Sequence, residues 1–177
     1  MDKIRVLALS GSLRRHSLNT AAIQTLQSLA PDYIEITQFS LGKLPLFNPD
    51  REDESIESVE SLKRNLQSSH GLIIASPEYA HGVTGVMKNA LDWLVSGEEF
   101  VDKPIMLINT SPRATHAQDA LKEILKTMSG RLIKNAHVTV PLLGSGLDMV
   151  SIRNDEEIVR LLSDGLSQFH QSISESF

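Results

Sequence analysis

Polar side chains gather directly after the first apolar run of the chain. Residues 9–19 read Leu-Ser-Gly-Ser-Leu-Arg-Arg-His-Ser-Leu-Asn. Ser12, Ser17 and Asn19 offer neutral hydrogen bonds, and Arg14 and Arg15 add positive charge. A helix that begins near Ser17 or Asn19 points the positive end of its dipole at the same place. The combination predicts an anion site, and a phosphate monoester is its natural occupant.

A polar loop with an N-cap serine is the simpler alternative, because Ser and Asn are favoured helix caps. The segment lacks the Gly-Lys-Ser/Thr ending of a Walker A loop and the Gly-x-Gly-x-x-Gly pattern of dinucleotide sites. It also lacks the threonine- and glycine-rich phosphate loop of flavodoxins. The anion site is therefore expected to be of a different type from these three.

A second loop with small residues follows the apolar run at residues 72–75. It reads Ser-Pro-Glu-Tyr-Ala-His-Gly-Val-Thr-Gly from residue 76 onwards. Pro77, Gly82 and Gly85 allow the backbone to run close to a planar ligand. A neutral flat ring needs mainly backbone hydrogen bonds and an apolar wall, which this loop can supply.

Four short apolar runs and five amphipathic helical patterns follow one another along the chain. A fifth strand candidate, at residues 33–37, alternates between apolar and polar residues and suits a position nearer the sheet edge. Strands are expected at residues 5–9, 33–37, 72–75, 104–109 and 137–140, and helices at 19–29, 55–69, 85–95, 117–128 and 156–169. Runs that are apolar throughout are typical of parallel strands buried on both faces. The alternation of strands and helices predicts one α/β domain over residues 1–177, with a doubly wound, five-stranded parallel sheet in the order 2-1-3-4-5 and helices on both faces. Both loops then lie where strands end and helices begin.

Composition excludes several classes of site. The 177 residues contain no cysteine, which rules out disulfides, thiolate metal sites and cysteine nucleophiles, and the net charge of −5 argues against nucleic acid. The six histidines show no short metal-ligand spacing, and Gly144-Ser145-Gly146 lacks the nucleophile-elbow pattern. No signal peptide or membrane-spanning stretch is apparent. We expect a cytoplasmic protein without metal, nucleic-acid or membrane partners.

The first loop resembles the Gly-Ser-x-Arg-x-x-Ser-x-Asn signature of the NADPH-dependent FMN reductase family, which includes bacterial flavin, quinone, azo and chromate reductases. The resemblance implies a flavodoxin-like fold. It assigns the FMN phosphate to Ser12, Arg14, Ser17 and Asn19, with Leu18 as a further cofactor-binding position.

The second loop is similar to the family motif Pro-Glu-Tyr-Asn-x-Ser-x-x-Gly-x-Leu-Lys-Asn-Ala-x-Asp-Trp. The matching residues are Pro77, Glu78, Tyr79, Gly85, Lys88, Asn89, Ala90, Asp92 and Trp93. Ala80, His81 and Gly82 stand where the motif has Asn and Ser, so main-chain contacts with the cofactor are expected from them. His81 either shapes the pocket or takes part in proton transfer.

Two weaker similarities lie elsewhere. Ser111 fits the serine of the family's third loop and is expected to touch the flavin, although the glycines of that loop are missing and Pro112 stiffens the turn. Arg113 is either a surface arginine or faces a nicotinamide dinucleotide. Residues 44–48, Leu-Pro-Leu-Phe-Asn, are similar to a loop that family members often place beside the partner subunit's flavin.

The resemblance implies an FMN-dependent NAD(P)H oxidoreductase that forms a homodimer or homotetramer. Hydride passes from NADPH or NADH to the flavin and then to a quinone, a flavin or a similar small acceptor. No catalytic side chain is expected, because the cofactor carries the hydride. Two alternatives stay open: a flavodoxin-like FMN-binding electron carrier without nicotinamide activity, and a nucleotide-binding regulatory domain that has lost the flavin.

Overall fold

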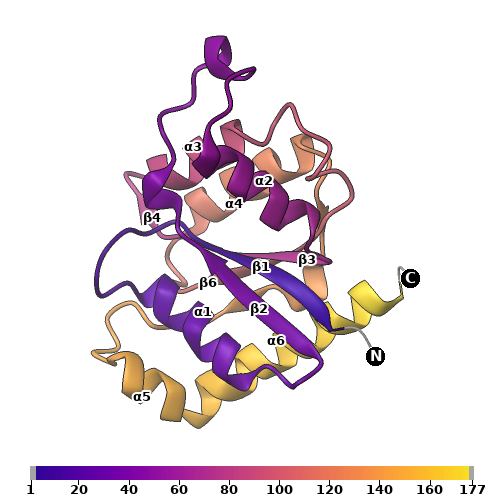
Figure 1. Ribbon diagram of the computed structural model, residues 1–177. Helices are drawn as coiled ribbons and strands as arrows, with labels where there is room; N and C mark the ends of the chain where they lie inside the picture. Colours follow the sequence, from indigo (N-terminus) through magenta and orange to yellow (C-terminus); the bar gives the residue numbers. More distant parts are fainter. Residues whose placement is uncertain (1–2, 176–177) are drawn as a thin grey trace.

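A parallel sheet runs through the middle of the computed structural model, which describes residues 3–175, and helices cover both of its faces (Figure 1). Its strands are β1 (Ile4–Ser10), β2 (Ile34–Phe39), β3 (Gly71–Ala75), β6 (Pro104–Asn109), β7 (Arg131–Leu132) and β8 (Val138–Thr139). They lie in the order β2-β1-β3-β6-β7, and β8 also pairs with β6. All of these pairings are parallel, so the predicted doubly wound sheet is confirmed.

The fifth position of the sheet differs from the prediction of one strand at residues 137–140. β7 pairs with the start of β6 and β8 with its end, and the 3-10 helix η3 (Lys134–Ala136) separates them. Lys134 and Asn135 are exposed, while Ile133 and Ala136 on either side are buried. The chain bulges outward to keep these two polar side chains in solvent. The sheet therefore has six strands, two of which share the fifth position.

Helices form one layer on each side of the sheet. They are α1 (Leu18–Leu29), α2 (Glu57–Gln67), α3 (Gly85–Asp92), α4 (Thr115–Thr127), α5 (Met149–Asn154) and α6 (Glu156–Ser174). In Figure 1, α1, α5 and α6 lie below the sheet and α2, α3 and α4 lie above it. The short α5 escaped prediction because its six residues are too few to show a helical period, and only Ile152 among them is buried. Within residues 3–175, none of the helices has the length and apolar character needed to cross a bilayer.

Each central strand supplies two hydrophobic cores. Along β1, Val6 and Ala8 pack into the core on the side of α1 and α6. Leu7 and Leu9 pack into the other core, with α2, α3 and α4. Every one of these positions must be apolar because solvent reaches neither face. This requirement explains why the strand shows no alternation of apolar and polar residues.

The segment between β2 and α2, which we call the projecting arm, extends above the helix layer (Figure 1). It contains the 3-10 helices η1 (Leu41–Lys43) and η2 (Pro49–Arg51). Asn89 of α3 anchors it at two points: its Nδ2 donates to the Pro45 carbonyl at 2.9 Å, and its Oδ1 accepts from the Phe47 amide at 2.7 Å. Trp93 Nε1 donates to the same carbonyl at 2.9 Å, and its ring packs edge-on against Phe47. Trp93, at 2 % exposure, is a core residue that holds this arm.

His137 is half-buried at the fifth position of the sheet, and its Nε2 has no hydrogen-bond partner within the described part of the chain. Burial lowers the pKa of His137 to about 4, and the nearby charges of Lys122 and Lys134 act in the same direction. The folded protein thus binds fewer protons at this site than the unfolded chain between the ordinary value of 6.5 and about 4.

This difference gives the stability a pH dependence of known sign. The unfolded state binds more protons in this window, so stability falls as the pH drops from 6.5 towards about 4. We expect His137→Asn to lose less stability than the parent protein over that range, with the free energy of unfolding measured by urea titration. All other titrating groups are common to both proteins and cancel in the difference. Parallel pH curves for the two proteins would contradict this assignment.

Candidate functional site

The first and second loops meet where β1 and β3 end. The Gly11 amide donates to the Ala75 carbonyl at 2.8 Å, and Thr84 Oγ1 donates to the Gly11 carbonyl at 2.7 Å. A Cβ atom at Gly11 would overlap the side chain of Ser76. Glycine is therefore required here by the close approach of the two loops, which brings both to one edge of the sheet.

The start of α1 forms the anion-attracting end of the site. Ser17 is its N-cap, and the Ser17 hydroxyl accepts a hydrogen bond from the Thr20 amide at 3.2 Å. The first helical amides, at Leu18 and Asn19, have no acceptor within a helix. The first turn carries no acidic residue, so nothing there offsets the positive end of the helix dipole. Such a helix start is suited to a phosphate.

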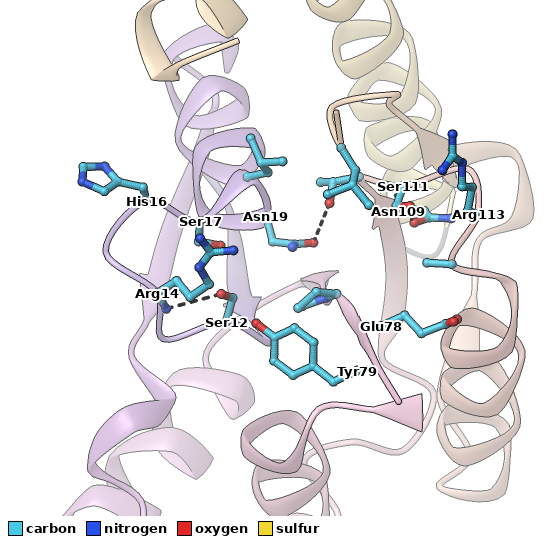
Figure 2. Close-up of a pocket in the computed structure, with 15 residues that line it drawn as sticks. Ser12, Arg14, His16, Ser17, Asn19, Glu78, Tyr79, Asn109, Ser111 and Arg113 are labelled. Atoms are coloured by element: carbon cyan, nitrogen blue, oxygen red, sulfur yellow. Dashed lines mark hydrogen bonds between the residues drawn. The ribbon is translucent and has the colours of Figure 1, made fainter. Parts of the chain in front are cut away.

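Arg14 stands beside this helix start with its charge available. The structure pairs no carboxylate of residues 3–175 with it. The Ser12 hydroxyl accepts from the Arg14 amide at 3.4 Å, which orders the loop between them. Figure 2 shows Arg14, Ser12 and Ser17 grouped on one side of the pocket. A planar guanidinium is suited to two phosphate oxygens at once.

A pocket of about 250 Å³ lies at the carboxyl ends of β1, β3 and β6 (Figure 2). The predicted site residues that line it are Ser12, Arg14, Ser17, Leu18, Asn19, Pro77, Glu78, Tyr79 and Ser111. Five further lining residues were not predicted from the sequence: His16, Asn109, Thr110, Ala114 and Leu143. Arg113, which the sequence left as either a surface residue or a contact of the nicotinamide dinucleotide, also lines the pocket. A second hollow, of about 320 Å³, adjoins it across Ser111, Arg113 and Leu143.

The missed residues had unequal signals in the sequence. Asn109 ends the strand β6 and Thr110 follows it, so the carboxyl end of a predicted strand could have indicated both. Thr110 Oγ1 donates to Asn19 Oδ1 at 3.2 Å, which joins the third loop to α1. Leu143 lies in the irregular segment between β8 and α5, where the sequence shows no helix or strand pattern that could have indicated it.

Three predicted site residues, Ala80, His81 and Gly82, lie outside the pocket lining. They belong to a hairpin formed by β4 (Glu78–Tyr79) and β5 (Gly82–Val83). Ala80 and His81 form its tip in the left-handed conformation, with φ of +49° and +58°. Main-chain contacts between these residues and a cofactor stay a prediction.

Glu78 lines the pocket, but its carboxylate is bound elsewhere. Oε2 accepts from the Ala117 amide at 2.8 Å, and Oε1 lies 2.9 Å from His81 Nδ1. The bond from Ala117 is the main cause that lowers the pKa of Glu78, with a smaller contribution from His81. Figure 2 shows this side chain directed towards α4 and away from Ser12, Arg14 and Ser17, which form the corner suited to a phosphate and are called the phosphate corner below. His81 in turn contacts the ring of His116, with centroids 4.7 Å apart.

The donors of the pocket fit the FMN that the sequence resemblance implies. The phosphate corner offers Arg14, two hydroxyls and a helix start, and the carboxylate of Glu78 is turned away from it. Pro77 and Tyr79 form an apolar and aromatic wall, and half of the Tyr79 surface is open to solvent. Arg113 stands at the opposite side of the mouth (Figure 2). The pocket therefore combines a corner suited to a phosphate with a wall suited to a flat ring.

Comparisons with known proteins identify the family of the chain. The model of the NADPH-dependent FMN reductase family matches residues 4–142, further than the sequence resemblance reached. A quinone reductase of Escherichia coli is 33 % identical over 115 residues, and an NAD(P)H-dependent FMN reductase of Pseudomonas aeruginosa is 35 % identical over 113 residues. In both cases the match covers 62 % of this chain and 61 % of the relative, so the chain spans about three fifths of the curated relatives' length.

A solved structure matches over almost the whole chain. The flavoenzyme NAD(P)H:acceptor oxidoreductase FerB of Paracoccus denitrificans superposes with a TM-score of 0.85 at 28 % identity, covering 97 % of each chain. An NADH:FMN oxidoreductase superposes with a TM-score of 0.68 at 19 % identity and supports the fold alone. The family match extends from β1 through the third loop and β8, and thus includes all three loops of the pocket. The chain belongs to the NADPH-dependent FMN reductase family.

Proposed function

We propose that the protein is an FMN-dependent NAD(P)H oxidoreductase that reduces a small acceptor such as a quinone or a flavin. The main support for this proposal is one pocket with two complementary parts. Arg14 and the start of α1 form a basic corner suited to a phosphate, and Pro77 and Tyr79 form a wall beside it. The names of the relatives support it and favour it over an electron carrier without nicotinamide activity. A cytoplasmic location, where both nicotinamides are available, suits this activity.

The side chains of the pocket bind and orient in this proposal. FMN, when bound, supplies the ring that accepts hydride and passes it on. Ser12, Arg14 and Ser17 hold the phosphate, while Pro77 and Tyr79 flank the ring. The open mouth lets donor and acceptor approach the same position in turn, so the protein contributes by placing them.

The cofactor and the activity can be tested together by visible spectroscopy. We expect the purified protein to carry FMN or to bind it on addition, with the flavin bands shifted from those of free FMN. NADPH or NADH should bleach these bands, and a quinone should restore them. Failure to bind FMN would refute the cofactor assignment. A flavin that dithionite bleaches but neither nicotinamide does would support the electron-carrier alternative.

Arg14 is expected to recognise the phosphate group specifically. A hydrogen bond to a charged group contributes roughly 1.5–3 kcal/mol, so Arg14→Ala should weaken FMN binding by roughly 10- to 150-fold. Riboflavin has the same ring without the phosphate and should lose much less affinity. Fluorescence titration of both flavins measures the two losses.

Arg15→Ala is the matched control, because Arg15 has the same charge, is next in sequence and does not line the pocket. It should bind FMN nearly as the parent protein does. Equal losses of FMN and riboflavin in Arg14→Ala would mean that Arg14 shapes the pocket in general. A larger loss in Arg15→Ala would place the phosphate on that residue.

We further propose that the protein forms a homodimer or homotetramer through its projecting arm. The arm holds Phe47 half-buried against Trp93, and Leu46 beside it is 84 % exposed. A single exposed leucine is normal on a protein surface, so the proposal rests mainly on the similarity of residues 44–48 to a loop that family members often place beside the partner subunit's flavin. Light scattering at micromolar concentration should give a multiple of the 19.5 kDa monomer mass, and Leu46→Glu should lower it. A monomer mass for the parent protein would count against this proposal.

A further inference from the structure

Helix α4 lacks a cap of its own. Ala114 occupies the N-cap position and has no side-chain acceptor, and the first turn contains no acidic residue. The carboxylate of Glu78, 39 positions earlier in the chain, accepts from the Ala117 amide at 2.8 Å in its place. A carboxylate there satisfies an unpaired helix amide and meets the positive end of the helix dipole.

The same carboxylate also holds the tip of the hairpin. Its other oxygen lies 2.9 Å from His81 Nδ1, across the left-handed pair Ala80 and His81. Non-glycine residues adopt this conformation at an energetic cost, so the turn depends on contacts that hold it. The ring of His81 then packs on His116, the second residue of α4. Glu78 thus joins the hairpin directly to α4 through Oε2, and through Oε1 it holds His81, whose ring contacts α4.

The two segments that Glu78 joins carry opposite walls of the pocket. Pro77 and Tyr79, its neighbours in sequence, form one wall, and Ser111 and Ala114, just before α4, form the other. The side chain of Glu78 is 13 % exposed and turned towards α4, so it bridges the two walls without entering the phosphate corner.

We propose that Glu78 is a positioning residue for the flavin, whose two hydrogen bonds set the width of the slot that receives the ring. This inference rests on the proposed binding of FMN. We call the two hydrogen bonds of Glu78, to Ala117 and to His81, the tether. The tether acts on the position of the ring, whereas Arg14 acts on the phosphate. Loss of the tether should therefore weaken FMN and riboflavin alike.

The test compares Glu78→Ala with Glu78→Gln. The glutamine can still accept from Ala117 and can donate to His81 Nδ1, so it should bind FMN within about threefold of the parent protein. The alanine variant should lose roughly tenfold for FMN and the same factor for riboflavin, by fluorescence titration at a temperature where it is folded. Visible circular dichroism of the bound flavin should change in the alanine variant, because it reports the surroundings of the ring. Glu123→Ala, an exposed residue of α4, is the control.

A second substitution distinguishes two roles of Glu78: capping of α4 and positioning of the hairpin. Ala114→Ser places an N-cap side chain on α4 but does not reconnect the hairpin. In the Glu78→Ala background, affinity for FMN should stay low, and Ala114→Ser alone reports any direct effect on the pocket. Recovery of affinity in the double variant would overturn the proposal. So would a glutamine variant as weak as alanine, an alanine variant that binds normally, or a loss confined to FMN.

A readout without flavin keeps this proposal distinct from the proposed function. In the apoprotein, hydrogen exchange of residues 76–84 should quicken in Glu78→Ala and stay unchanged in Glu123→Ala. Unchanged exchange in Glu78→Ala would refute the tether even if FMN binds to the parent protein. Faster exchange in a protein that never binds FMN would leave the tether in place and refute the cofactor assignment.

Discussion

The backbone of Gly11 lies directly against the second loop, and the pocket depends on this contact. Its amide bonds to Ala75 and its carbonyl accepts from Thr84, so the loops that follow two neighbouring strands are fixed to each other. The helix start behind one loop and the hairpin of the other then face a common space. A side chain at Gly11 would push the loops apart and separate the phosphate corner from the ring wall.

The pocket attracts anions although the chain as a whole is negatively charged. The chain carries a net charge of −5, yet Arg14, Arg113 and the start of α1 bring positive potential to the pocket. Glu78 would oppose them if its oxygens faced inward. Its bonds to Ala117 and His81 direct its charge to the start of another helix. One carboxylate thus stabilises α4 and leaves the phosphate corner favourable to an anion.

Sequence reasoning succeeded where a local requirement dictates the residue. The central strands were predictable because both of their faces are buried, and the start of α1 because Ser17 is a typical cap. The split of the fifth strand was not, since it depends on how Lys134 reaches solvent beside a neighbouring strand. Helix α5, with six residues, is too short to show a helical period in the sequence. The bond between Glu78 and Ala117 joins distant segments, and only tertiary packing determines it.

The motif of residues 77–93 contains two structural tasks that are separate in space. Its first part builds the hairpin beside the pocket, and its helical part, through Asn89 and Trp93, grips the projecting arm at Pro45. The departures at Ala80 and Gly82 fall in the hairpin, while both anchors of the arm match the motif. A change in the hairpin can thus alter what it contacts at the pocket and leave the attachment of the arm in place.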